Sequence, residues 1–210
     1  MAAAKTKTRR RKTDDRSTDD KLIDAALELA ADAPWHTVTL PMIAEHADVP
    51  LGQALLCLPS RGHIQRALID RVDARVFGGL EDDPLDGSTK DKLFDMLMRR
   101  FDVLGEHRAA LRTMSRDARR DPLAAACLGT RLLKSMALSL QAAGVSPEGC
   151  MGALKAKALT AIHLSAFRVW LSDDDPGLAA TMAALDKGLA RAEKIAVRSS
   201  ASEDSATKTP

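Results

Sequence analysis

The stretch TVTLPMIAEHADVPLGQALLCLPSR, residues 37–61, holds two short helical patterns on either side of an Asp-Val-Pro break. Thr39 is placed to cap a helix that runs to about His46. A second short helix is predicted from Leu51 to Leu58, where a Pro-Ser step interrupts the chain. Two short helices joined by a tight turn form a helix-turn-helix, so this motif is predicted to organise the N-terminal region.

Helical periodicity continues on both sides of the motif. A first helix is predicted to begin after Ser17 or Thr18 and to end before Pro34, and a fourth is predicted near residues 63–80. The acidic stretch at 81–87, which contains Pro and Gly, is predicted to be a solvated loop between two domains. A calcium loop is a poor alternative there, because apolar and proline residues stand where oxygen ligands would be needed.

Strand signals are nearly absent, because the chain has no Tyr and its β-branched residues do not alternate with polar ones. The sequence therefore predicts an all-α fold. Its predicted parts are a basic disordered arm at 1–17, a helix-turn-helix domain with a linking helix at 18–80, a helical ligand-binding and dimerisation domain at 88–197, and a small, polar, disordered tail at 198–210. Within the second domain, helices are predicted near 88–104, 108–116, 122–143, 146–171 and 175–197.

Size and composition suit a soluble globular protein. The 210 residues are 45% hydrophobic, enough to form a substantial core. Neither a run of 18 apolar residues nor the apolar stretch of a signal peptide is found, so a cytoplasmic location is expected. Cys57, Cys127 and Cys150 lie far apart among small apolar residues, which predicts buried thiols and no disulfide.

Positive charge is concentrated at the N-terminus. Residues 1–16 carry seven basic and two acidic side chains, whereas the rest of the chain carries 24 basic and 27 acidic ones. Such an arm is typical of proteins that neutralise DNA phosphates or enter the minor groove, and Arg9, Arg10, Arg11 and Lys12 are the predicted contacts. The alternative is a solvated leader with no partner.

Catalytic, cofactor and metal signatures are not found in the sequence. No glycine-rich phosphate loop, HExxH, CxxC or GxSxG pattern occurs, and no His stands three or four residues from another His or Cys. We therefore expect no enzyme activity, no cofactor and no metal site.

Several bulky side chains of the second domain are candidates for an apolar ligand pocket, since Met adapts its shape and such pockets form between helices. These candidates are Met96, Phe101, Met136, His163 and Phe167. Ordinary core packing is the alternative for all of them. For His163, which lies on an apolar helical face, a position at a subunit interface is a further alternative.

The segment LIDAALELAADAPWHTVTLPMIAEHADVPLGQALLCLPSRGHIQRALID, residues 22–70, resembles the DNA-binding domain of the TetR (tetracycline-repressor-like) family. The resemblance implies that Thr39 and Arg61 contact DNA phosphates and that the third helix enters the major groove. In that helix, Gly52 would permit close backbone approach and Gln53 would read a base edge. It also implies a homodimer formed by the last two long helices.

Two departures from the family pattern stand out. The usual Gly-Val-Ser turn is Asp48-Val49-Pro50 here, and the usual Tyr-His-Tyr-Phe run is Leu-Leu-Cys-Leu at 55–58. The later segment KLFDMLMRRFDVLGEHRAALRTMSRDARRDP is also similar to a group lying between TetR regulators and the TetR-fold lipid-binding proteins of ubiquinone biosynthesis. The predicted function is a ligand-responsive repressor that binds double-stranded DNA and a small apolar ligand or lipid. The alternative is a lipid-binding accessory protein of ubiquinone biosynthesis without specific DNA binding.

Overall fold

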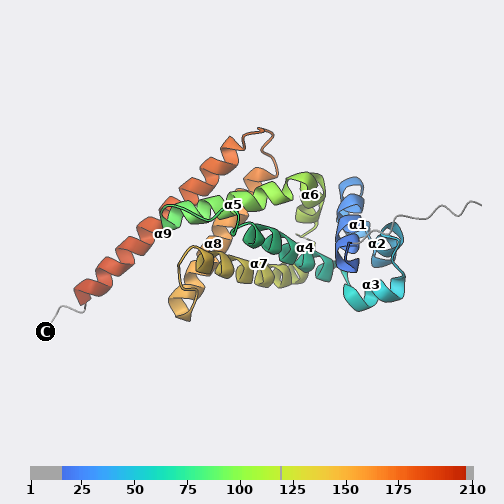
Figure 1. The fold of residues 1–210 in the computed structure, drawn as a ribbon, viewed down its shortest axis with the longest axis horizontal. Helices are drawn as coiled ribbons and strands as arrows, with labels where there is room; N and C mark the ends of the chain where they lie inside the picture. The colour runs from blue at the N-terminus through green and yellow to red at the C-terminus, as the bar shows by residue number, and fades with distance from the viewer. Residues whose placement is uncertain (1–15, 119, 207–210) are drawn as a thin grey trace, which may run out of the picture.

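The computed structural model describes residues 16–118 and 120–206, and every regular element in these ranges is helical (Figure 1). The elements are α1 (Thr18–Asp32), η1 (Trp35–Thr37), α2 (Leu40–His46), α3 (Leu51–Cys57), α4 (Arg61–Gly78), α5 (Thr89–Leu104), η2 (Gly105–His107), α6 (Arg108–Asp117), α7 (Pro122–Ala142), α8 (Gly149–Trp170) and α9 (Ala179–Ala206). The predicted all-α fold is confirmed. In Figure 1 the helices α1 to α3 form a head at one end, and α5 to α9 form an elongated body.

Capping side chains define the starts of the head helices. The Ser17 hydroxyl accepts the backbone N–H of Asp20 at the start of α1, and the Ser60 hydroxyl accepts that of His63 at the start of α4. The turn between α2 and α3 passes through Asp48, which has a φ of +54°. This left-handed conformation favours glycine, and Asp is among the residues that tolerate it best. The Asp-Val-Pro sequence therefore still makes the turn.

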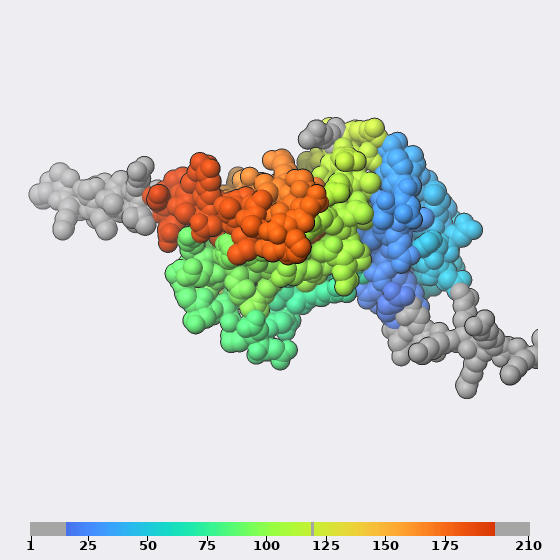
Figure 2. All heavy atoms as spheres, turned by 90° about the horizontal axis from the view of Figure 1, so that it is seen from above, coloured from blue at the N-terminus to red at the C-terminus, as the bar shows by residue number. Residues whose placement is uncertain are grey.

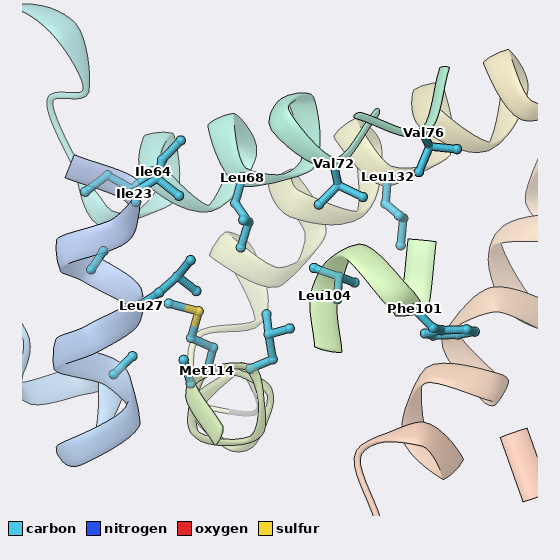
Figure 3. Packing of buried hydrophobic residues seen from close by; sticks show 14 of the residues in the cluster. Ile23, Leu27, Ile64, Leu68, Val72, Val76, Phe101, Leu104, Met114 and Leu132 are labelled. Carbon is cyan, nitrogen blue, oxygen red and sulfur yellow. The ribbon is translucent and has the colours of Figure 1, made fainter. Parts of the chain in front are cut away.

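Helix α4 joins the head to the body. Its first half presents Ile64 and Leu68 to Ile23 and Leu27 of α1, and its second half presents Val72 and Val76 to the body (Figure 3). Met114 of α6 lies beside Leu27, and Leu104 of α5 and Leu132 of α7 lie along the second half of α4. Because these residues belong to one buried cluster, head and body share a continuous apolar core.

Within the body, α5 packs against α4 and α9. The Ser88 and Asp91 side chains form the predicted capping box at the start of α5. Helix α7 packs against α4 and α8, and α8 packs against α9. By length and mean hydropathy α7 would suffice to cross a membrane. Its Arg131, however, pairs with Asp70 and Asp73 of α4, which holds it in the helical body.

Three helix ends of the body differ from the prediction. Helix α8 begins at Gly149, later than predicted. The chain before it lies close to the helix, because a Cβ at Gly152 would lie 2.1 Å from the Pro147 carbonyl carbon. Helix α9 begins at Ala179, after Asp175 has accepted the backbone N–H groups of Gly177 and Ala179. Helix α9 continues to Ala206, beyond the start of the tail predicted at 198–210.

The predicted burial of the three cysteines is wrong. Cys57, Cys127 and Cys150 are all exposed free thiols. Cys57 lies on the outer side of α3, and Cys127 lies in the first part of α7, where residues 122–130 include no buried side chain. Small apolar neighbours along the chain did not indicate burial, because other helices do not cover these stretches.

Candidate nucleic-acid interface and ligand core

Helix α3 is almost entirely uncovered. Ala54 is the one buried residue among its seven. Leu51 is 43% exposed, Leu55 48% and Leu56 88%. Since a helix turns by about 100° per residue, Leu56 and Gly52 point directly away from the side on which Ala54 contacts the head. The predicted third helix therefore presents an open surface that is mainly leucine.

Of the polar residues predicted to contact DNA, Thr39 precedes α2, Gln53 lies on α3 and Arg61 begins α4. Thr39 is exposed, and its hydroxyl makes no capping bond to α2, so it is open to a partner. The Gln53 amide Nε2 donates to the Thr18 hydroxyl of α1 at 2.8 Å. Arg61 lies over the Trp35 ring at 5.6 Å and donates from Nη1 to the Trp35 carbonyl oxygen at 2.5 Å. Gln53 and Arg61 are thus partly engaged within the head, a feature that the motif did not reveal.

A Cβ at Gly52 would have no heavy atom within 4 Å. The backbone of α3 is therefore open to close approach at this residue. The predicted arm contacts Arg9, Arg10, Arg11 and Lys12 lie outside the described residues. The hydrogen bond between Gln53 and Thr18 nevertheless shows that the chain enters α1 directly beside α3.

Three of the predicted pocket residues meet in the core of the body. The Phe101 ring stacks on His163 with centroids 5.3 Å apart, and Phe167 lies 6.3 Å from His163. Trp170 stacks on both phenylalanines at 5.6 Å. Met96 and Met136 are fully buried in the same apolar core. Phe101, His163 and Phe167 therefore lie together, with Trp170 as a neighbour that the prediction omitted.

Polar atoms without a partner lie within this core. Among the described residues, the buried side-chain atoms that lack a hydrogen bond are Arg100 Nε, His163 Nδ1 and Trp170 Nε1. Burial, with the nearby Arg100 charge, lowers the pKa of His163 to about 3, so the imidazole is neutral at physiological pH. Buried polar groups are rarely left unsatisfied in folded proteins, so these three atoms are candidate ligand contacts.

Arg100 also belongs to a buried ionic cluster. Its Nη1 donates to Asp73 of α4, and Asp73 also accepts from Arg131 Nη2 at 2.7 Å and from the Ser135 hydroxyl at 2.6 Å. Burial lowers the pKa of the Arg100 guanidinium, and the Asp73 carboxylate opposes that effect. The cluster joins α4, α5 and α7, and it was not predicted. Its one sequence signal is that Arg100 stands on the same helical stripe as Leu93, Leu97 and Leu104.

An open cleft of about 300 Å³ lies between the end of α5 and the junction of α8 and α9. Phe101 and Trp170 line it, together with Arg108, Asp174 and Leu178. Arg108 lies 4.6 Å over the Trp170 ring and donates to the Asp173 carbonyl oxygen at 2.5 Å. The aromatic core therefore borders an opening to solvent, although 300 Å³ is at the small end of the range for ligand sites.

Polar contacts connect the head to α6 of the body. The Asp117 carboxylate accepts the backbone N–H of His36 at 2.6 Å and contacts its Nδ1 at 3.0 Å. Desolvation raises the pKa of Asp117, but the hydrogen bonds from His36 outweigh it and the pKa lies below the usual value. The Thr113 hydroxyl donates to the Ala30 carbonyl oxygen at 2.5 Å. A movement of α6 would therefore displace α1 and η1, to which it is hydrogen-bonded.

Among the described residues, no group of three or more His, Cys, Asp or Glu side chains is arranged to hold a metal ion. The acidic loop predicted between the domains, residues 81–87, uses Asp83 to pair with Arg99 of α5 at 2.7 Å. This carboxylate therefore takes part in an ordinary surface ion pair.

The fold resembles solved regulators of the TetR family. A TetR transcriptional regulator from Nitrosomonas europaea has a TM-score of 0.69 and 24% identity, covering 85% of this chain and 99% of that one. A putative TetR-family regulator from Syntrophomonas wolfei has a TM-score of 0.59 and 15% identity, covering 85% and 94%. A TetR regulator from Rhodococcus has a TM-score of 0.56 and 20% identity, covering 81% and 92%.

No protein-family model matches the sequence. No curated protein matches it either. The chain therefore has the fold of the TetR transcriptional regulators, and the likeness extends over both the head and the body.

Proposed function

We propose that this protein is a DNA-binding transcriptional regulator of TetR type that works as a homodimer and responds to a ligand. The observation that carries the proposal is the placement of α3. It follows α2 in a helix-turn-helix, buries Ala54 alone and leaves its outer surface open. Beside it stands the start of α1, which the basic arm precedes in the sequence.

Phosphate contacts supply most of the affinity in this proposal. The exposed Thr39 hydroxyl and the remaining guanidinium donors of Arg61 are the proposed phosphate contacts of the head. The seven basic side chains of residues 1–16 add a strong, salt-dependent attraction. The rest of the chain carries more acidic than basic side chains. DNA attraction would therefore be confined to the head.

Exposed apolar side chains on α8 and α9 support dimerisation through these helices. On α8, Met151, Leu154 and Leu164 are 47%, 59% and 38% exposed. Leu154 lies opposite the face that buries His163, and Met151 and Leu164 lie on the two flanks of that face. On α9, Met182 is 41% exposed. Two copies that meet along this surface would bury it and present two heads to two half-sites of an operator.

Ligand response would begin at the aromatic core and the ionic cluster of the body. A ligand acceptor that pairs with Arg100 competes with Asp73 for its guanidinium and so loosens the attachment of α5 to α4. Since α4 also packs on α1, and α6 is bonded to His36 and Ala30 of the head, a shift in the body changes the position of α3. The spacing of the two heads would then no longer match the operator.

A lipid-binding accessory role in ubiquinone biosynthesis is the second candidate. The observation that favours it is the leucine surface of α3, which suits an apolar partner. Native mass spectrometry of the purified chain tests this role. A long-chain isoprenoid that copurifies in near-stoichiometric amount would favour the second candidate, and a lipid-free protein with no thermal shift on lipid addition would count against it.

DNA binding is tested by fluorescence anisotropy on the DNA upstream of the protein's own coding sequence, at two salt concentrations. We expect binding that weakens steeply with salt, with a smaller salt slope when Arg9, Arg10, Arg11 and Lys12 are replaced by alanine. Arg61→Ala should weaken binding, whereas Lys134→Ala, an exposed cation on α7, serves as the matched control. Absence of both specific and salt-dependent binding would overturn the proposed function.

A further inference from the structure

We propose that α3 reads thymine methyl groups, so that the protein selects duplexes rich in A·T pairs. This inference rests on the proposed DNA-binding function and names the chemistry of its recognition surface. Thymine is the base that carries an apolar group, the C5 methyl, in the major groove, and apolar side chains recognise it by contact.

The geometry of α3 supplies that contact. Leu56 is 88% exposed and points away from the head, and Leu55 and Leu51 lie on the adjoining side of the helix. Gly52 stands next to Leu56 on the outer face, with open space around it. A helix with a glycine at its outermost position can approach the base edges closely enough for leucine side chains to touch methyl groups.

Hydrogen-bonding readers are few on the same surface. Gln53 is the polar side chain of α3, and its Nε2 is bonded to Thr18 at 2.8 Å. A G·C pair presents its polar groups in the major groove, so an apolar surface placed over it would leave those groups without partners. An A·T pair also presents polar groups there, so the preference of the leucine surface for A·T pairs rests on its contact with the thymine methyl group.

The basic arm points to the same sequences. A·T-rich tracts have a narrow minor groove with a strong negative potential, which attracts arginine side chains. Residues 1–16 contain four arginines and three lysines, and this segment leads into α1 beside α3. This charge favours duplex DNA as the occupant of the leucine surface, because major-groove and minor-groove contacts would select the same base pairs.

The test uses the full chain and a duplex selected by it from a random library. Fluorescence anisotropy compares this duplex with one in which every thymine is replaced by uracil, which removes the methyl groups and keeps the base pairing. We expect about fourfold weaker binding for each methyl group contacted, from the transfer energy of one buried methyl-sized group. In Leu56→Ala the difference between thymine and uracil duplexes should shrink, whereas Leu123→Ala, a 75% exposed leucine on α7, should leave it unchanged.

Three outcomes would overturn the inference, and they separate it from the proposed function. Equal affinity for thymine and uracil duplexes, with DNA still bound, removes thymine reading and leaves the regulator role intact. A thymine preference that persists when Leu51, Leu55 and Leu56 are all replaced by alanine assigns the preference to DNA shape. If no duplex is bound and the protein instead binds vesicles containing anionic phospholipid through the same leucines, both the inference and the proposed function fail.

Discussion

The head and the body break the usual distribution of side chains in opposite directions. In the head, α3 holds Leu51, Leu55 and Leu56 at the surface, where polar groups are expected. In the body, α4 and α5 hold Asp73 and Arg100 in the interior, 5% and 2% exposed, where apolar groups are expected. Exposed apolar side chains also occur on α7, α8 and α9, but there each helix buries other apolar residues as well.

Both departures cost stability in the isolated chain, since exposed leucines forgo burial and buried charges must be desolvated. Sequences usually follow the rules of local consistency except at functional sites. We therefore interpret the exposed leucines of α3 as a surface for an external partner. We interpret the buried pair of Asp73 and Arg100 as the contact that joins α4 to the ligand core. The predictions below test whether the two regions behave as differently as their burial indicates.

The largest loss of folding stability is expected from a substitution in the buried ionic cluster of Asp73, Arg100 and Arg131. Asp73→Ala leaves the Arg100 and Arg131 guanidiniums without their shared carboxylate, which should lower the free energy of unfolding by about 3–5 kcal/mol. Urea denaturation measures this loss. Asp70→Ala is the matched control, because Asp70 is 59% exposed and pairs with Arg131 alone, and we expect a change below about 1 kcal/mol. Equal effects of the two substitutions would contradict the distinct role of Asp73.

The second largest effect is expected from lowering the pH, which should reduce the free energy of unfolding. The folded-state pKa of His163 is about 3 and its ordinary value is 6.5, so between these pH values the unfolded chain binds a proton that the folded chain does not. The free energy of unfolding should therefore fall as pH falls below 6.5, by up to about 1.4 kcal/mol per pH unit. His107, whose pKa burial also lowers, acts in the same direction.

Urea denaturation at pH 7 and pH 5 measures the slope, and His163→Phe isolates the contribution of the buried imidazole. The variant keeps an aromatic ring against Phe101 and removes the titrating group. Its stability should depend less on pH than that of the parent chain. Identical pH dependence in the two proteins would mean that His163 is not held neutral.

A smaller effect is expected where head and body meet. Asp117→Ala removes the acceptor of the His36 backbone N–H and should cost about 1.5 kcal/mol, the scale of a hydrogen bond to a charged group. Hydrogen exchange should show faster exchange of the His36 amide in the variant. Asp121→Ala is a control, because Asp121 caps α7 at Ala124 and does not contact the head. Unchanged exchange at His36 in Asp117→Ala would indicate that head and body are coupled elsewhere.

The smallest change in folding stability is expected from a substitution on the exposed surface of α3. Leu56→Ala should change the free energy of unfolding by less than about 0.5 kcal/mol, because the side chain is 88% exposed. Thermal denaturation measures it, with Leu22→Ala in buried α1 as a contrast that should cost about 2–5 kcal/mol. A loss above about 1 kcal/mol in Leu56→Ala would mean that α3 serves the fold more than a partner.

Local sequence patterns predicted the head well. Ser17, Thr39 and the Asp-Val-Pro turn mark helix boundaries that the structure places within one residue of those predicted. Capping groups, prolines and short periodic stripes act over a few residues, so they can be read directly along the chain. The same reasoning correctly predicted the capping box of Ser88 and Asp91.

Tertiary arrangement limited the prediction of the candidate site. Asp73 and Arg100 are 27 positions apart, and the residues around each of them do not indicate that the two pair. Arg61 and Gln53 were predicted as DNA contacts, and their bonds to Trp35 and Thr18 depend on how η1 and α1 pack beside them. The exposed cysteines were mispredicted for the same reason, because burial depends on distant helices and not on neighbouring residue types.

Three exposed thiols allow a direct test of whether α3 faces DNA. Cys57 lies on α3, whereas Cys127 on α7 and Cys150 on α8 belong to the body. Alkylation with iodoacetamide, followed by mass spectrometry, measures the reaction rate of each thiol with and without saturating duplex DNA. The account predicts that DNA slows labelling of Cys57 and leaves Cys127 and Cys150 unchanged. Unchanged labelling of Cys57 while DNA is bound would contradict it.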